Sequence, residues 1–343
     1  MVTVSNFVDS TELLRDEPSL RARLDRDGYL YLRGILPRSK VDELRTRVLE
    51  AAREFFILRS ADDNLEENTM NISAPDESCS YDKFYRYIWS LEIFHSLGHV
   101  QDILRVISAL LRVQSQEDIL IHPRKQLRAA LPRQKPLVDL REGWHQDYPE
   151  IQGALSTITA WAPLVPVGPR TGALAIVPGS HNNGIFPLRL ASGPAGWEAT
   201  VEPATVHSGE LFPGDVLLFS PLTLHRPMPH TGNSFRLSMD VRYQPISEEI
   251  SETCLQAFDQ TYGWEDVYAN WSESSTHRFY WTKYPIHVIP CDRSWDDWRE
   301  AEALAAGRAG MKRACKALQL VAEFSPHLHA REEAARLLKS IAP

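Results

Sequence analysis

Residues 213–243 read PGDVLLFSPLTLHRPMPHTGNSFRLSMDVRY, in which two apolar runs flank a turn rich in proline, glycine and polar residues. The pattern predicts a strand, a turn and a second strand. Similar short runs, separated by Pro or Gly turns, continue back to Gln116. Short strands so evenly interrupted are typical of an antiparallel sandwich or barrel, and not of alternating strands and helices. The predicted fold class is therefore an all-β core.

Segments outside this core predict added helices. Residues 38–56 carry apolar side chains at three- and four-residue intervals, as one buried helical face requires. Residues 18–27 form a second predicted helix, followed by a strand with the sequence GYLYLRGIL. The sequence from residue 294 is rich in Ala, Leu, Glu and Arg, which predicts one or two further helices. We therefore expect a β domain with N-terminal helices over residues 1–293 and a helical extension over residues 294–343.

An aromatic cluster follows a polar stretch near the start of the chain. Residues 58–80 are acidic and lack periodicity, which predicts an exposed loop. Five aromatic residues lie within residues 81–89 directly after it. This cluster either packs into the core, as most aromatic stripes do, or forms a lid together with the loop.

Composition excludes several classes of protein. The 343 residues are 43% hydrophobic and 24% charged, so a folded globular chain is expected. A net charge of −8 would repel a phosphate backbone, and no apolar stretch approaches the roughly 20 residues that span a bilayer. We therefore expect neither nucleic acid nor membrane as a partner. The four cysteines include no CxxC pair and no signal peptide is visible, which indicates a reduced, cytoplasmic compartment. The predicted C-terminal helix could cover the β core or mediate a dimer, so we expect a monomer or a homodimer.

The sequence GWHQD at residues 143–147 places His145 and Asp147 two positions apart. In an extended segment such residues project to the same side, so an imidazole nitrogen and a carboxylate oxygen can meet at one metal ion. His225 lies 80 residues further on, next to an apolar run. Two histidines and one carboxylate form the triad that Fe(II) oxygenases use, with three metal positions left open. His230 is an alternative third ligand, but His225 is favoured by its place at the predicted strand end.

The last predicted strand alternates in polarity. Arg236, Ser238, Asp240 and Arg242 share one face, while apolar residues occupy the other. An arginine pairs with a carboxylate through two hydrogen bonds, so Arg236 with Ser238 predicts a clamp for a 2-oxo acid whose other end binds the metal. Asp240 and Arg242 are interpreted as a structural pair.

The combined motifs resemble the phytanoyl-CoA dioxygenase family, whose members are Fe(II)- and 2-oxoglutarate-dependent oxygenases built on a double-stranded β-helix, a jelly-roll barrel. The matching pieces span roughly residues 20–245. They are GYLYLRGIL, WHQD at 144–147, TGALAIVPGSH at 171–181, PGDVLLF at 213–219, LHRPMPH at 224–230 and the strand at 236–243.

The resemblance implies functional roles for individual residues. It implies metal ligands at His145, Asp147 and His225, a 2-oxoglutarate arginine at Arg236 and an aromatic neighbour of that cosubstrate at Trp161. An asparagine is frequent in the family where this chain has His230.

The implied cofactors are Fe(II), 2-oxoglutarate and O2, and the implied reaction is oxidation of an unactivated C–H bond. Related halogenases have a small residue where this chain has Asp147, so the aspartate favours hydroxylation. The same iron chemistry in relatives also gives desaturation, cyclisation or epimerisation. The length and charge fit a tailoring enzyme in secondary metabolism that acts on a small molecule.

Two functions from other classes compete with this interpretation. A cupin-like metal isomerase would use the histidines but has no need for Arg236 and Ser238. A non-catalytic ligand-binding protein would gain nothing from an intact triad.

The candidate substrate contacts rest on fewer observations. Gln126 and Arg128 alternate on a predicted strand that resembles a pocket-lining strand of the family, although a solvated edge strand would look the same. Trp144 and Tyr148 flank the metal motif and are candidates for shaping the pocket.

Overall fold

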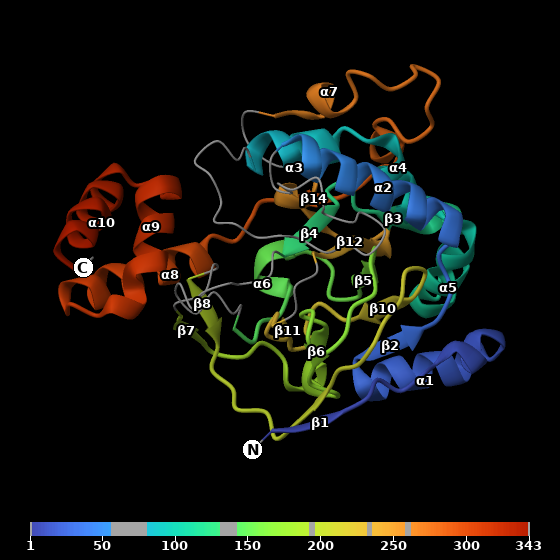
Figure 1. Cartoon of the computed structure of the whole chain (residues 1–343), viewed down its shortest axis with the longest axis horizontal. Coiled ribbons are helices and arrows are strands. Elements are labelled where there is room, and N and C mark those ends of the chain that lie inside the picture. The colour runs from blue at the N-terminus through green and yellow to red at the C-terminus, as the bar shows by residue number, and fades with distance from the viewer. Residues whose placement is uncertain are drawn as a thin grey trace.

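The computed structural model describes residues 2–55, 81–130, 143–191, 196–231, 235–257 and 262–341 (Figure 1). The polar stretch over residues 58–80 lies outside the described residues. The expectation of a β-rich core with added helices is confirmed: two larger sheets occupy the middle of the molecule and helices surround them.

The main sheet has the strand order β2-β10-β5-β12-β3, and β4 pairs with the other part of β12. Every pairing in this sheet is antiparallel. The bounds are Tyr29–Leu32 for β2, Ile119–Ile121 for β3, Gln126–Ala130 for β4, Ile158–Pro163 for β5, Val216–Phe219 for β10 and Arg236–Pro245 for β12.

The second sheet has the order β1-β9-β6-β11, where β1 is Thr3–Ser5, β6 Leu174–Ile176, β9 Thr205–His207 and β11 His225–Pro227. Two further pairs are β7 with β8, Leu188–Leu190 and Trp197–Ala199, and β13 with β14, Ile250–Ser251 and Val288–Ile289. The stretch 213–243 therefore holds three strands and not two. The chain passes from the main sheet at β10 to the second sheet at β11 and returns at β12.

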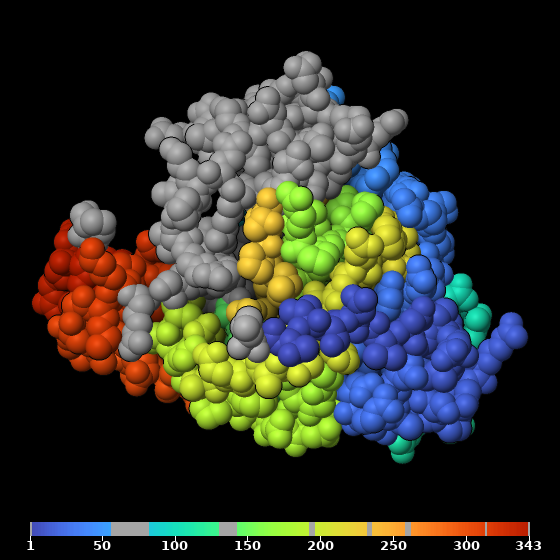
Figure 2. Space-filling view, turned by 60° about the horizontal axis from the view of Figure 1, so that its bottom comes forward, coloured from blue at the N-terminus to red at the C-terminus, as the bar shows by residue number. Residues whose placement is uncertain are grey.

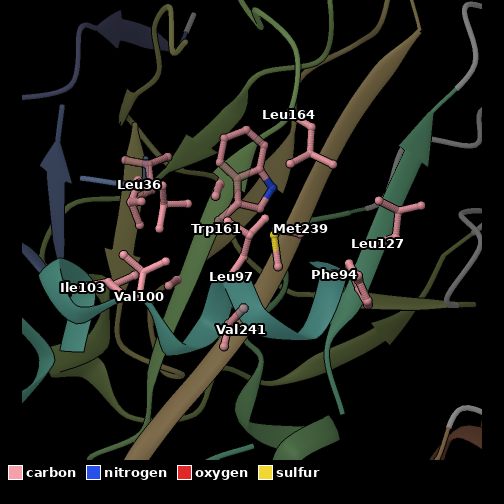
Figure 3. Close-up of a cluster of buried hydrophobic side chains, with 14 of the residues drawn as sticks. Leu36, Phe94, Leu97, Val100, Ile103, Leu127, Trp161, Leu164, Met239 and Val241 are labelled. Atoms are coloured by element: carbon pink, nitrogen blue, oxygen red, sulfur yellow. The ribbon is translucent and has the colours of Figure 1, made fainter. Parts of the chain in front are cut away.

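Helices cover the apolar face of the main sheet. They are α1 Glu17–Asp27, α2 Arg38–Glu54, α3 Tyr81–Trp89, α4 Glu92–Ser96 and α5 Gln101–Leu111. Figure 3 shows Met239 and Val241 of β12 facing Leu97 and Val100 from the helical layer, and all four side chains are buried. The opposite face of β12 bears the polar row that begins at Arg236, so the apolar packing of one face aims the polar row at the other side of the sheet.

The aromatic cluster belongs in part to this core. Phe84 and Ile88 of α3 are fully buried in the main hydrophobic cluster. The prediction that aromatic residues of this segment pack into the core is therefore confirmed for Phe84.

Short helices complete the described chain. The α-helices are α6 Tyr148–Ile151 and α7 Trp264–Val267, and the 3-10 helices are Thr11–Arg15, Leu97–His99, Gln116–Asp118, Ser180–Asn183, Glu252–Cys254, Tyr280–Lys283 and Lys312–Ala314. Among the described residues, no helix has both the length and the apolar character needed to cross a membrane.

The C-terminal segment forms three helices where one or two were predicted: α8 Ser294–Arg308, α9 Cys315–Phe324 and α10 Leu328–Ile341. They share a hydrophobic cluster of their own, which includes Leu304, Leu318 and Val321 and which Leu190 of β7 joins. In Figures 1 and 2 these helices, orange to red, form a lobe at one end of the molecule, opposite the N-terminal helices.

Candidate metal centre and adjoining pocket

Two histidines from distant parts of the chain face each other across a backbone bridge. The N–H of His145 donates to the carbonyl of His225, the reverse bond also forms, and both N–O distances are 3.0 Å. His225 is the first residue of β11, which β6 holds in register through Ile176. This bridge fixes both Cα positions and brings the imidazole ring centroids to 4.2 Å.

Asp147 completes the group. One ligand atom from each of His145, Asp147 and His225 lies within 4.8 Å of the others, and His225 Nε2 is 3.7 Å from Asp147 Oδ1. Among the described residues this is the only set of three such side chains so placed. Adjacent ligands of one ion, at bond lengths of about 2.0 to 2.2 Å, lie roughly 3 Å apart. The His225 Nε2 to Asp147 Oδ1 distance of 3.7 Å is already close to this spacing.

Hydrogen bonds orient both histidines. His145 Nδ1 lies 3.0 Å from the Gly143 carbonyl, and His225 Nδ1 lies 2.9 Å from the Thr223 carbonyl. A carbonyl only accepts, so each Nδ1 carries the hydrogen and each Nε2 keeps its lone pair. Burial is the main cause that lowers the pKa of His225 to about 4, with His145 as a second cause. His225 is therefore neutral at neutral pH, which is the form that binds a metal.

Asp147 is oriented through its second oxygen. Oδ2 accepts from Thr159 Oγ1 at 2.9 Å and from Arg242 at 3.1 Å, so Oδ1 is the oxygen left for a metal. Burial is the largest single cause and opposes ionisation of this carboxyl, but the neighbouring charged groups, Arg242 first among them, together outweigh burial and hold the pKa of Asp147 well below its usual range. The carboxylate is therefore ionised, and its charge is matched by a cation that is also buried.

These donors fit Fe(II). Two neutral imidazoles and one carboxylate on one side of an ion leave three positions open, which is the pattern of non-haem iron oxygenases. Each ligand also has a fixed hydrogen-bond partner behind it, as metal-binding side chains usually have. His230, the alternative third ligand, lies outside this group: it is bridged to Thr171 at the far side of the segment that follows β11.

The polar face of β12 lies next to Trp161. The Arg236 guanidinium is 5.5 Å from the centre of the Trp161 ring, and Arg236 is only 7% exposed. Ser238 is fully buried, and its hydroxyl has no hydrogen-bond partner among the described residues. Buried polar atoms are normally satisfied, so this hydroxyl points to a ligand or a water molecule. A buried cation beside an unsatisfied hydroxyl and an aromatic face suits one end of a dicarboxylate.

The interpretation of Asp240 and Arg242 as a structural pair is wrong. Arg242 binds Asp147, as described above, and Asp240 accepts from Arg128 Nε at 3.0 Å. Both side chains instead pair across to neighbouring segments because β12 lies between β4 and β5 in this region. Arg242 thus fixes a metal ligand, while Asp240 fixes a side chain of the pocket.

A pocket of about 220 Å³ opens beside the triad. Its lining includes His145 and Asp147, and on one wall four alternate residues: His122, Arg124, Gln126 and Arg128. The structure thus places Gln126 and Arg128 at the pocket, on a strand whose Leu127 points into the core. This strand is not solvated on both faces, because Leu127 between them is buried and Lys125 directly before them is fully buried.

The other two candidate substrate contacts lie elsewhere. Trp144 is buried in a small cluster with Ala175 and Leu224, and Arg226 lies 4.6 Å over its ring. It points away from the pocket because residues on either side of His145 project to the opposite side. Tyr148 is half-buried at the start of α6 and is not among the described residues that line the pocket.

Sequence reasoning missed several residues of the site. Arg124 and His122 share the parity of Gln126 and Arg128, so extending that alternation would have identified them. Thr159 lies two positions before Trp161 on the same strand, so alternation would also have placed it on the face that carries Trp161. Trp197 and Cys254 also line the pocket but come from segments with no local signal in the sequence.

Comparison with known proteins gives one family match. The sequence profile described as phytanoyl-CoA dioxygenase (PhyH) matches residues 24–238. Two curated relatives are 1-deoxypentalenic acid 11-beta-hydroxylases, each 29% identical to this chain. The protein from Streptomyces exfoliatus aligns over 276 residues and the one from Streptomyces arenae over 279, in both cases 76% of this chain and 92% of the relative.

Solved structures resemble the chain less closely. A non-heme monooxygenase, ThoJ, is 17% identical with a TM-score of 0.48, covering 67% of this chain and 78% of that protein. The epimerase SnoN, in complex with Fe3+, alpha ketoglutarate and nogalamycin RO, is also 17% identical with a TM-score of 0.48. It covers 70% of this chain and 87% of that one.

Proposed function

The chain belongs to the phytanoyl-CoA dioxygenase family, and on this premise we propose that it hydroxylates an unactivated C–H bond of a small molecule in a biosynthetic pathway. It is an Fe(II)- and 2-oxoglutarate-dependent dioxygenase, as members of this family are. The proposal rests chiefly on the metal-binding atoms of His145, Asp147 and His225, which lie close together. The second polar atom of each side chain, Nδ1 of the histidines and Oδ2 of the aspartate, is held by a hydrogen bond. The relatives named as hydroxylases support the reaction type.

The iron centre, when loaded, would activate O2: one oxygen atom enters succinate as 2-oxoglutarate loses CO2, and the other enters the C–H bond of the substrate. The chain's own residues prepare that centre. The Gly143 and Thr223 carbonyls hold the two imidazoles, and Arg242 with Thr159 holds the carboxylate. We propose that Arg236 and Ser238 bind the far carboxylate of 2-oxoglutarate, with Trp161 against it.

Burial of the site serves the reaction. Asp147 and His225 are each 6% exposed, so little of either ligand is open to bulk water. The pocket brings a substrate to the side of the triad formed by His145 and Asp147. A bound substrate there would exclude water from the reacting face. We propose Gln126 and Arg128 as substrate contacts on its wall.

Two structural expectations also stand as proposals. We propose that the two sheets together form the double-stranded β-helix of the family, because β10, β11 and β12 pass alternately between them. We also propose that residues 1–293 form the oxygenase domain and residues 294–343 an extension, because α8, α9 and α10 have a hydrophobic cluster of their own.

The test is iron-dependent conversion of 2-oxoglutarate to succinate by the purified chain with Fe(II), ascorbate, O2 and a panel of small terpenoid and polyketide substrates. We expect succinate from the wild type and none from a His225→Ala variant. A hydroxylated product gains one oxygen atom derived from O2. Desaturation or cyclisation removes two hydrogens, and epimerisation leaves the mass unchanged. Absence of succinate from the wild type under all conditions would falsify the oxygenase proposal.

A further inference from the structure

Arg124 lies where two pockets meet. The pocket beside the triad adjoins a second one, of about 140 Å³, that extends toward the C-terminal helices. Arg124, Glu150, Trp197 and Thr253 line both. The second pocket is completed by residues beyond the family match, among them Trp295 of α8. A molecule that spans the two pockets therefore lies against Arg124.

The other two arginines that line the pocket beside the triad have carboxylate partners. Arg128 donates to Asp240 at 3.0 Å, and Arg242 donates to Asp147 at 3.1 Å. These charges are therefore compensated within the protein, and a bound anion would gain less from them.

Arg124 differs from both. Its only hydrogen bond among the described residues runs to the Thr253 carbonyl at 3.4 Å, and its buried Nε has no hydrogen-bond partner there. Within the described part of the chain Arg124 forms no ion pair, although the exposed carboxylate of Glu150 lines the same pockets. A partly buried guanidinium that keeps no counter-ion is costly, and an anionic ligand would remove that cost.

We propose that Arg124 binds a carboxylate carried by the substrate and thereby directs the rest of the molecule toward the triad. The inference rests on the proposed function, because it concerns the substrate of that same site. Arginine suits the task because its planar fork donates two parallel hydrogen bonds to one carboxylate. The buried Trp197 ring beside it offers an apolar surface to the adjacent part of the substrate. The substrate class is thus a small organic acid with an apolar body.

Binding of a matched pair of probes tests this inference. Cyclohexanecarboxylate and cyclohexanecarboxamide have the same shape but differ in charge, and calorimetry measures their affinities for the full chain. The protein carries Mn(II), which does not start the reaction, and saturating 2-oxoglutarate, so that neither probe enters the cosubstrate site. We expect the acid to bind the wild type at least about tenfold tighter than the amide, as a charge-assisted pair implies.

Variants locate the preference. Arg124→Gln should abolish it, and Arg124→Lys should keep part of it because the charge remains while the fork is lost. Arg299→Gln is the matched control: this arginine lines the second pocket, but Asp296 already accepts from it at 2.8 Å. Its loss changes the net charge near the pocket without removing the proposed contact, so the preference should persist.

The outcomes separate this inference from the proposed function. Equal affinity for the two probes, no binding of the acid, or an unchanged preference in Arg124→Gln would overturn the role of Arg124. Succinate formation by the wild type tests the oxygenase separately, and it can succeed while the probe experiment fails. Conversely, a clear acid preference without any 2-oxoglutarate turnover would refute the oxygenase and leave only a binding site for organic acids.

Discussion

Asp147 and Arg242 provide a direct test of how the centre is held. Their side chains are 8% and 6% exposed and the Oδ2 to guanidinium distance is 3.1 Å, so neither charge has much contact with water. Asp147→Asn keeps the shape of the side chain but removes its charge, which leaves the Arg242 cation buried without its partner. Breaking a buried pair in this way costs about 3 to 5 kcal/mol of unfolding free energy.

A second substitution separates charge pairing from metal binding. Arg242→Met in the Asp147→Asn background removes the stranded cation, so most of the lost stability should return. Metal binding should not return, because one of the three ligands is still missing. Wild type with Mn(II) at 100 times its dissociation constant should gain about 2.7 kcal/mol, and neither variant should gain any.

Urea unfolding with EDTA and with Mn(II) measures all of these quantities on the full chain. The reasoning fails if Asp147→Asn without metal is as stable as wild type, because the pair would then contribute nothing. It also fails if the double variant is no more stable than the single one, because the cost would then come from something other than the unpaired arginine. Recovery of metal stabilisation in the double variant would contradict the role of Asp147 as a ligand.

Three further predictions follow from other parts of the chain. Arg236→Ala should weaken 2-oxoglutarate binding about 100-fold, because a charge-assisted pair is lost, and should leave the affinity for Mn(II) unchanged. Titration of the protein with Mn(II) and then with 2-oxoglutarate measures both affinities, and an unchanged 2-oxoglutarate affinity would exclude the clamp. Burial lowers the pKa of Lys125 from 10.5 to about 7, so between these values the unfolded chain holds the proton that the folded chain has lost, and stability should rise with pH by up to about 1.4 kcal/mol per unit. Lys125→Met should remove this slope, and parallel pH profiles of the two proteins in urea unfolding would contradict it. Gly196→Ala should destabilise the C-terminal helices by about 1 to 3 kcal/mol, because Gly196 has a φ of +73° and the new Cβ would lie 2.9 Å from Ala317 Cα. Hydrogen exchange across α9 measures this loss of stability, and unchanged protection would refute the close approach.

The metal centre was predictable to a large extent because its signals are local. The two-residue spacing of His145 and Asp147 gives side chains on one side of an extended segment. The alternation along residues 236–242 likewise predicts which side chains share a face, and the register of β12 with β5 confirms that parity. The helices α1 and α2 agree with their predicted ranges within two residues at each end, since apolar periodicity is a property of the helix alone.

Partners across strands were not predictable in this way. Parity places Asp240 and Arg242 on one face but does not say which neighbouring strand approaches each of them. Because β12 pairs with β4, Asp240 accepts a hydrogen bond from Arg128. Thr159 of β5 lies opposite Arg242 and donates to Asp147, which brings the segment that carries Asp147 near Arg242. The expected Asp240–Arg242 pair is therefore replaced by two ion pairs: Arg242 with the metal ligand Asp147, and Arg128 of the pocket with Asp240.

The sequence by itself determined the chemistry of the centre: which side chains can bind a metal, and which face of each strand carries them. Only the tertiary structure decided that His225 and not His230 meets His145, because that depends on the backbone bridge between two segments about 80 residues apart. It also decided that Arg124 keeps no counter-ion among the described residues while Arg128 and Arg242 are paired. The physical reason is that charge compensation inside a protein is set by distances between chain segments, and a sequence orders those segments without fixing their separation.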